Sequence, residues 1–363
     1  MLYLQQKKEI REIEKVIMRI YSNKKEAKSA NKLVENLQNY FVERLNAISK
    51  EFGDNQPFEA VEWLRDKGRH GGGIRFEARD ESIYNRASVN VSQVHYDNDP
   101  SKKLSSATAI SSIIHPKNPH APSMHMHFSW TQMRDGKGYW RLMADLNPSL
   151  VPSQNNKELF DTMLANAAGE VYLDEGLAQG EHYFNIPVLN RTRGVSHFYL
   201  ENFNRGDFEQ DRTYVEQFAK KVVDRYIEIT TNALIEHSDY TKEERQKQLD
   251  YHTIYLFQVL TLDRGTTSGL LIHNQNDVGI MGSLPSHINR KLLESWVEKM
   301  PKPQDKLLKS IIEALPNENP THIDIEVKIK LANSVREHYK KYPQALKLQA
   351  SGEVIPTTVT NHL

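Results

Sequence analysis

Cysteine is absent from this chain of 363 residues. Without thiols, a disulfide framework, a thiolate metal site and a cysteine nucleophile are all excluded, and the composition fits a reducing compartment. Charge of one sign is not in excess either, because 47 Lys and Arg balance 47 Asp and Glu. No apolar run reaches the roughly 18 residues of a membrane-spanning helix, and the N-terminus lacks the apolar core of a signal peptide. We therefore expect a cytoplasmic globular protein with no nucleic-acid partner and no membrane span.

Apolar spacing predicts helices at both ends of the chain. Residues 5–52 indicate two amphipathic helices, and further helical patterns follow the middle of the chain. Their ranges are 155–180, 208–250, 287–314 and 324–341. The residues that set the spacing of the first two helices are Ile10, Ile13, Ile17, Ile20, Leu33, Leu37, Phe41 and Leu45.

Alternating side chains predict strands in the middle of the chain, from about residue 70 to 147. Turn signals lie at Arg79-Asp80-Glu81 and in RDGKG, residues 134–138. Strand texture returns at 253–272 and 278–284. Strands flanked by helices without regular alternation predict an α+β fold with a large, mostly antiparallel sheet. We expect one domain over 1–363, with N-terminal helices in 1–55 and an extra helix and loosely ordered tail in 315–363.

One segment concentrates histidine and proline, and reads IIHPKNPHAPSMHMHFSW from residue 113 to 130. Successive side chains of a strand point to opposite faces, so MHMHFSW predicts an apolar face of Met, Met, Phe and Trp. His125, His127 and Ser129 then form the other face. The three prolines fix the backbone around His115 and His120. This pattern favours a polar cavity wall, and surface histidines on an edge strand are the plainer alternative.

Two chemistries fit the histidine pair. His125 and His127 can supply two ligands to a metal ion, as in a metal-dependent enzyme, but such a site needs a further ligand that the spacing does not identify. Imidazole also serves acid–base work, because it titrates near neutral pH.

The same segment, with its neighbours, resembles the oxygen-dependent coproporphyrinogen III oxidases. The segment ISSIIHPKNPHAPSMH matches the family pattern VSxxIHPxNPxxPxxH closely. The resemblance spans a core of about 60–300. The supporting motifs, in the family's order, are HGGG at 70–73, ASVNVSQVH at 87–95, DLNP at 145–148, RGVSHFYLENFN at 193–204, DRGTTSGL at 263–270 and SLP at 283–285.

This resemblance implies a flat antiparallel sheet covered by helices on both faces, in a homodimer. It also implies a step of haem biosynthesis, in which oxygen converts coproporphyrinogen III to protoporphyrinogen IX with no metal or cofactor. The bound partner would be this tetrapyrrole. By resemblance, His125 is the proton donor and Asp145 faces the pyrrole nitrogens, while the substrate contacts carried over from the family are Ser111, His115, Asp263 and Arg264.

The chain departs from the family where the substrate's carboxylates would bind. Ser129 and Asn276 stand where the family has arginines, His127 stands for an asparagine, and Arg141-Leu142-Met143 replaces a glycine triplet. The alternative function is therefore a diverged paralogue that binds or transforms another tetrapyrrole or similar ligand.

A rearranged site would restore the missing charge. Antiparallel pairing around Asp135 predicts Ser129 opposite Arg141 and His125 opposite Asp145. Arg141 would then place a guanidinium near the lost one, and His127 and Arg141 join the predicted substrate contacts. The plainer alternatives are that Arg141 only pairs with Asp145 or extends its charged end to solvent.

Overall fold

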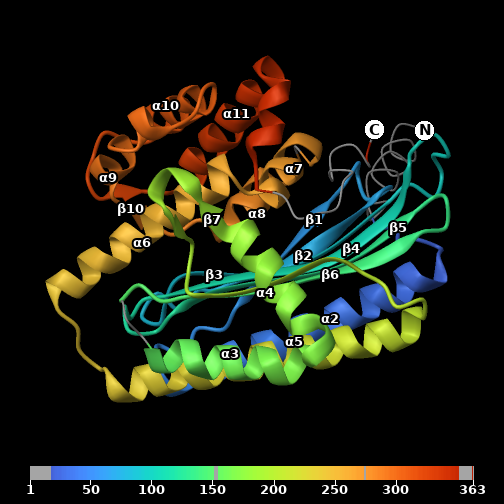
Figure 1. Ribbon diagram of the computed structural model, residues 1–363, viewed down its shortest axis with the longest axis horizontal. Coiled ribbons are helices and arrows are strands. Elements are labelled where there is room, and N and C mark those ends of the chain that lie inside the picture. The colour runs from blue at the N-terminus through green and yellow to red at the C-terminus, as the bar shows by residue number, and fades with distance from the viewer. Residues whose placement is uncertain (1–17, 151–153, 274, 351–361, 363) are drawn as a thin grey trace, which may run out of the picture.

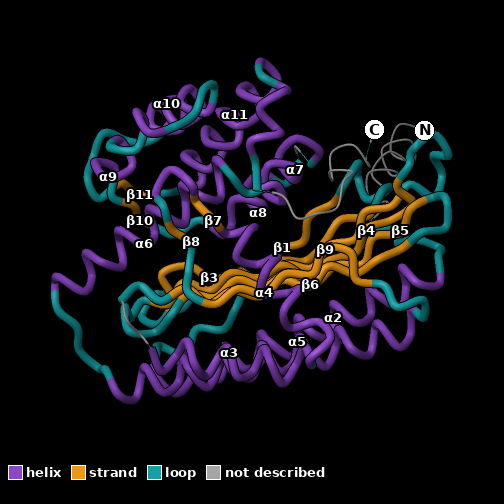
Figure 2. The backbone as a smooth tube through the Cα atoms, in the orientation of Figure 1, coloured by secondary structure: helices purple, strands orange, loops and turns teal. Residues whose placement is uncertain are grey.

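A seven-stranded antiparallel sheet forms the centre of the molecule (Figures 1 and 2). The computed structural model describes residues 18–150, 154–273, 275–350 and 362. The strands pair in the order β1-β2-β3-β4-β5-β6-β9. Their bounds are β1 Glu59–Leu64, β2 Gly71–Glu77, β3 Tyr84–His95, β4 Leu104–Pro116, β5 Ser123–Met133, β6 Gly138–Asn147 and β9 Ser196–Phe203. The predicted α+β class with a large antiparallel sheet is confirmed.

One face of the sheet packs on a layer of three long helices, seen below the sheet in Figure 1. These are α2 (Lys25–Phe52), α3 (Gln154–Ala168) and α5 (Phe208–Glu236). Alternate side chains of β5 face these helices. They are apolar and fully or almost fully buried, as predicted. That set is Met124, Met126, Phe128 and Trp130.

The C-terminal half forms a second helical layer on the opposite face (Figure 1). Its helices are α6 Lys242–Thr261, α7 Arg264–Ile272, α8 Asp277–Ile280, α9 Arg290–Glu294, α10 Gln304–Ala314 and α11 Ile325–Lys341, and α4 (Glu170–Phe184) packs against β9. Two small pairs, β7 (Asn185–Ile186) with β8 (Arg191–Thr192) and β10 (His287–Ile288) with β11 (Thr321–His322), complete the fold.

The prediction of strands at 253–272 and 278–284 was wrong. These residues form the end of α6, then α7, α8 and a short 3-10 turn. Every residue from Tyr251 to Thr261 is buried, so this part of α6 is covered on all sides within the chain. A helix buried all round has no polar face, and its sequence then carries no helical period.

Helix starts follow capping chemistry. The Asp207 side chain accepts from the backbone N–H groups of Glu209 and Gln210 at the start of α5, both at 3.0 Å. Thr241 and Glu244 form a reciprocal capping box at α6. The predicted Asp-Arg-Gly turn is likewise a helix start, because the Asp263 side chain accepts from Thr266 N–H at 2.6 Å and caps α7.

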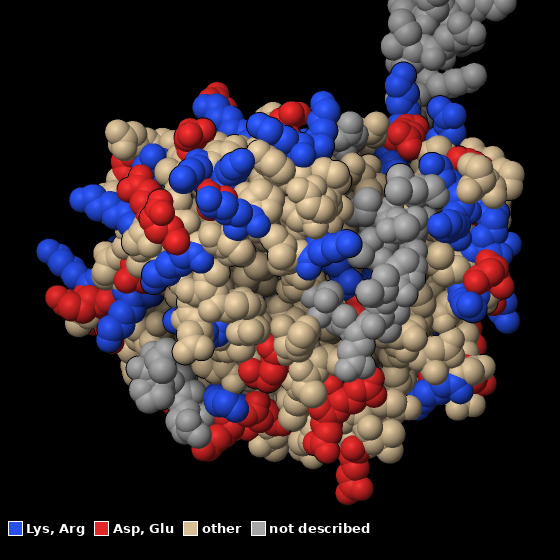
Figure 3. Space-filling model, turned by 45° about the horizontal axis from the view of Figure 1, so that its top comes forward, with Lys and Arg blue, Asp and Glu red and all other residues tan. Residues whose placement is uncertain are grey.

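The structure describes most of the C-terminal extension but little of the first predicted helix. The first predicted helix lies mostly outside the described residues, and residues 18–24 are not helical. In the C-terminal extension, α11 packs on α7, α8 and α10, and Arg336 donates to Asp277 of α8. Among the described helices, none is long and apolar enough to span a bilayer. Both kinds of charge lie on the face in Figure 3, with many of the acidic side chains gathered along its lower part.

Candidate active site

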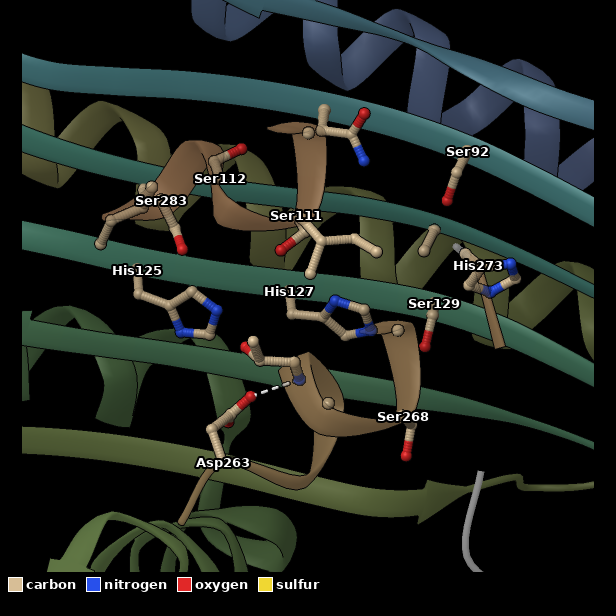
Figure 4. A pocket seen from close by; sticks show the side chains of 18 of the residues that line it. Ser92, Ser111, Ser112, His125, His127, Ser129, Asp263, Ser268, His273 and Ser283 are labelled. Carbon is tan, nitrogen blue, oxygen red and sulfur yellow. Dashed lines mark hydrogen bonds between the residues drawn. The ribbon is translucent and has the colours of Figure 1, made fainter. Parts of the chain in front are cut away.

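A cavity of about 290 Å³ lies between the polar face of the sheet and α7. Figure 4 shows His125 and His127 of β5 entering it from the sheet, with Asp263 at the start of α7 opposite them. Five predicted site residues line this cavity, and Ser129 lines it with them. The five are Ser111, His125, His127, Arg141 and Asp263.

The β5–β6 hairpin has the predicted register. Ser129 pairs with Arg141 and His125 pairs with Asp145. Cross-strand partners share a face of the sheet, so all four side chains lie on the side away from α2, α3 and α5. The turn at residues 134–138 allows this register because Gly136 adopts a φ of +90°, which L side chains rarely do.

His125, Asp145 and Arg193 form a buried hydrogen-bonded chain. His125 Nδ1 lies 2.8 Å from Asp145 Oδ1, and Arg193 Nη2 lies 2.8 Å from Asp145 Oδ2. A carboxylate accepts only, so Nδ1 of His125 carries the hydrogen. This bond fixes the ring and leaves Nε2 for the cavity.

Asp145 itself does not line the cavity. Its side chain is fully buried, and Oδ2 also accepts from Asn147 Nδ2 at 2.7 Å. Burial would raise the pKa of Asp145, but the charges of Arg193 and His125 and the hydrogen bonds from His125 and Asn147 hold it well below its usual range. Asp145 is thus an ionised group that orients His125, and the expectation that it faces the pyrrole nitrogens directly is not met in this geometry.

Arg193 was missed in the sequence analysis. It is 2% exposed, donates from Nη1 to Gln258 Oε1 at 2.7 Å, and lies over the rings of Phe184 and Tyr255 at 4.5 and 5.0 Å. Its guanidinium also reaches the cavity wall. The available signal was its place as the first residue of the RGVSHFYLENFN motif, before a glycine.

Gly194 explains why that motif contains a glycine. It has a φ of +124°, and a Cβ there would lie 2.5 Å from Asn147 Oδ1 and 2.7 Å from Leu146 O. The loop can therefore press against the end of β6 and bring Arg193 to Asp145.

His127 and Arg141 differ in protonation although both line the cavity. Burial, then the charges of His125 and Arg141, lower the pKa of His127 to about 3, so this ring is neutral at neutral pH. Arg141 donates to Tyr139 Oη at 3.3 Å, and within the described residues it has no carboxylate partner. The plainer alternative, a pair of Arg141 with Asp145, is wrong because Arg193 holds that carboxylate.

Asp263 is the carboxylate that lines the cavity. Its Oδ2 accepts from Tyr183 Oη at 2.9 Å, while Oδ1 caps α7. Each carboxylate oxygen accepts about two hydrogen bonds, so Asp263 retains capacity for a donor in the cavity.

Two predicted substrate contacts lie elsewhere. His115 is fully buried, with Nδ1 2.8 Å from Ser123 Oγ and Nε2 3.1 Å from Ser283 O. Arg264 is buried in an ion pair with Glu201. Neither side chain lines the cavity.

The cavity wall carries polar atoms that lack partners. Buried oxygens without a hydrogen bond in the described structure are Asn90 Oδ1 and the hydroxyls of Ser112, Ser129 and Ser268. Buried polar atoms normally find partners, so these point to a polar ligand or ordered water. Within the part of the chain that the structure describes, no group of three His, Asp or Glu side chains is arranged to hold a metal ion.

The fold and the residues of the cavity indicate the class of protein. A histidine oriented by a buried carboxylate, a second carboxylate and two guanidiniums around one cavity are typical of an enzyme that acts on an anionic ligand.

The comparisons identify the family. The family model described as coproporphyrinogen III oxidase matches residues 29–313, and the chain belongs to this family. The oxygen-dependent coproporphyrinogen-III oxidase of Drosophila melanogaster is 26% identical over 269 residues, which cover 68% of each chain. That of Rickettsia akari is 27% identical over 271 residues, covering 70% of this chain and 94% of the relative. The match extends beyond the expected core of 60–300 and includes most of α2 and nearly all of α10.

Proposed function

We propose that this chain catalyses the oxygen-dependent oxidative decarboxylation of coproporphyrinogen III to protoporphyrinogen IX. Family membership and the names of the relatives support the reaction. The observation that carries it is the presence in one cavity of His125, Asp263 and Arg141, which has no carboxylate partner among the described residues. A ligand that carries carboxylates and N–H groups needs a guanidinium, a carboxylate and a proton-exchanging imidazole, and the proposal assigns such a ligand to this cavity.

The proposed roles follow from the contacts. Asp263 accepts from the pyrrole N–H groups, and Arg141 binds a propionate. His125 exchanges a proton through Nε2, with Asp145 and Arg193 as positioning residues. Ser111 and His127 contribute neutral hydrogen-bonding groups to the same wall, since burial keeps His127 uncharged.

The chemistry needs only electrons that the substrate itself holds. Each reacting propionate loses CO₂, a proton and two electrons and becomes a vinyl group. Oxygen accepts the electrons, so we propose that no metal or organic cofactor takes part. The protein's part is to bind, orient and move protons.

We further propose a homodimer in the cytoplasm. Residues 253–261 are buried within the chain as part of α6, so this apolar run gives no argument for a subunit interface, and the dimer rests on family resemblance alone. Light scattering at micromolar concentration tests the dimer, and a monomer would contradict it. The absence of cysteine fits a reducing compartment, and cell fractionation tests the location.

The direct test of the reaction starts without oxygen. Purified protein is incubated anaerobically with coproporphyrinogen III, oxygen is added, and products are followed by chromatography. We expect protoporphyrinogen and carbon dioxide only after oxygen is added. Binding without turnover in oxygen would instead support the diverged binder.

A charge-relocation swap tests the site. Because Ser129 and Arg141 are cross-strand partners, the double variant Arg141→Ser with Ser129→Arg moves the guanidinium one strand back. We expect Arg141→Ser alone to raise KM and the swap to recover much of the loss. A swap no better than the single variant would refute the proposed equivalence of the two positions.

A further inference from the structure

A second pocket, larger than the first, opens where the sheet ends beside the start of α6. Its volume is about 540 Å³. It is lined by the start of β3, by Lys117 just after β4, by α6, and by residues in and beside the β10–β11 pair. Four of its residues are cationic and one, Glu81, is acidic; the cations are Arg86, Lys117, Lys242 and Arg245.

These cations come from two different parts of the fold. Arg86 and Lys117 belong to the sheet end, and Lys242 and Arg245 belong to the first turns of α6. Arg245 contacts the ring and hydroxyl of Tyr240, and within the described residues none of the four has a carboxylate partner. The protein as a whole is neutral, so this local excess of positive charge is a property of the pocket.

Arg86 and Lys328, a cation on which the charge of Arg86 acts, add to this excess of positive charge. Arg86 Nε is buried without a hydrogen bond in the described structure, and burial lowers the pKa of Arg86. Lys328 of α11 is 4% exposed, and burial followed by the charge of Arg86 lowers its pKa to about 8. Glu77, which faces both, is held by Arg75 at 2.6 Å. Unpaired buried cations are costly, and a bound anion would compensate them.

A buried histidine also lacks a partner here. His252 of α6 lines the pocket, is 2% exposed, and its Nε2 has no hydrogen-bond partner among the described residues. Burial, then the charge of His287, lowers its pKa to about 3, so the ring is neutral. A neutral imidazole offers one nitrogen to a ligand without adding charge.

We infer that this pocket binds a small molecule that carries two or more anionic oxygen groups, phosphate or carboxylate. Four cations from two parts of the fold favour a ligand with more than one anionic group, and the volume exceeds that of a single inorganic ion. The site is separate from the candidate active site, although its buried wall adjoins it. The His252 ring lies 5.0 Å from that of His115, whose Nε2 donates to Ser283 of the cavity wall.

Titration calorimetry at low ionic strength tests the site on the full chain, with inorganic tripolyphosphate and citrate as probes. We expect saturable binding of at least one of them, and the tighter probe assigns phosphate or carboxylate. Binding should weaken as salt rises, because screening reduces attraction at a solvent-open pocket. Failure of both probes to bind would overturn the inference.

A matched pair of variants separates the pocket from general charge. Arg245 and Lys247 are both exposed on α6, and only Arg245 lines the pocket. We expect Arg245→Glu to weaken binding at least about tenfold and Lys247→Glu to have a much smaller effect, since charge interactions fall off with distance. Equal losses in the two variants would refute a defined site. His252→Phe, which keeps the ring packing, should also weaken binding without loss of helical circular dichroism.

Discussion

Replacing Asp145 by asparagine removes one charge from a buried pair and leaves the other in place. Asp145 and Arg193 are 0% and 2% exposed, and Arg193 Nη2 lies 2.8 Å from Asp145 Oδ2. An uncompensated buried charge costs about 3–5 kcal/mol of unfolding free energy. We therefore expect Asp145→Asn to be strongly destabilised as well as impaired in turnover.

Urea unfolding at neutral pH measures this loss. Asp135→Asn in the β5–β6 turn is the matched control, because its pair with Lys137 is 57% and 82% exposed and should contribute at most about 1 kcal/mol. The double variant Asp145→Asn with Arg193→Met removes both charges and should recover part of the stability. An Asp145→Asn protein as stable as the control would refute the argument that a buried ion pair holds His125.

The same pair fixes the sign of the pH dependence. The folded pKa of Asp145 lies below its unfolded value of about 3.9, so its stabilisation is complete above that value and is lost as pH falls toward the folded pKa. The wild-type chain should lose stability through this acid range, and Asp145→Asn should lose less. Equal acid slopes in both proteins would contradict the pKa assignment.

Three further predictions address the site and the fold. Arg141→Met should raise KM for coproporphyrinogen III at least about tenfold with a smaller effect on kcat, because a charge-assisted hydrogen bond of about 1.5–3 kcal/mol is lost. Steady-state kinetics measure this change, with Arg191→Met as the control. An unchanged KM would show that Arg141 does not bind the substrate. Turnover should survive chelation, and elemental analysis checks that the active protein is metal-free; activity restored only by a metal would contradict the reaction as proposed. Thr241→Ala should lower the unfolding free energy by about 1 kcal/mol through loss of the α6 capping box, measured by urea unfolding.

Strand features could be predicted from the sequence because their signals are local. Alternation over MHMHFSW separates a buried face from a polar one, and Asp135-Gly136 fixes the turn and hence the register. Ser129 opposite Arg141 follows from these two facts alone. A one-residue error would have reversed every side chain, so this register is a demanding test that the prediction passed.

Other features depend on tertiary contacts that no local pattern carries. Residues 253–261 are buried on every side of α6, which removes the helical period and leaves only an apolar run. Arg193 lies 48 residues from Asp145 and reaches it through the loop after β8. Full burial of an arginine runs against ordinary composition, so only its motif position could have indicated its role.

The four histidines of the proline-rich segment show how the surroundings assign different chemistry to one residue type. His115 is fully buried, and both of its ring nitrogens are hydrogen-bonded within the fold, so its role is structural. His120 stacks on His237 at 3.9 Å and lies 3.2 Å from Glu244, away from the cavity. His127 lines the cavity but is held neutral, with a pKa of about 3. Of the four, only His125 combines a place in the cavity with a hydrogen bond to a buried carboxylate, which orients its ring. For this reason we propose His125, and none of the other three, as the proton-transfer group, with Asp145 as the ionised residue that positions it.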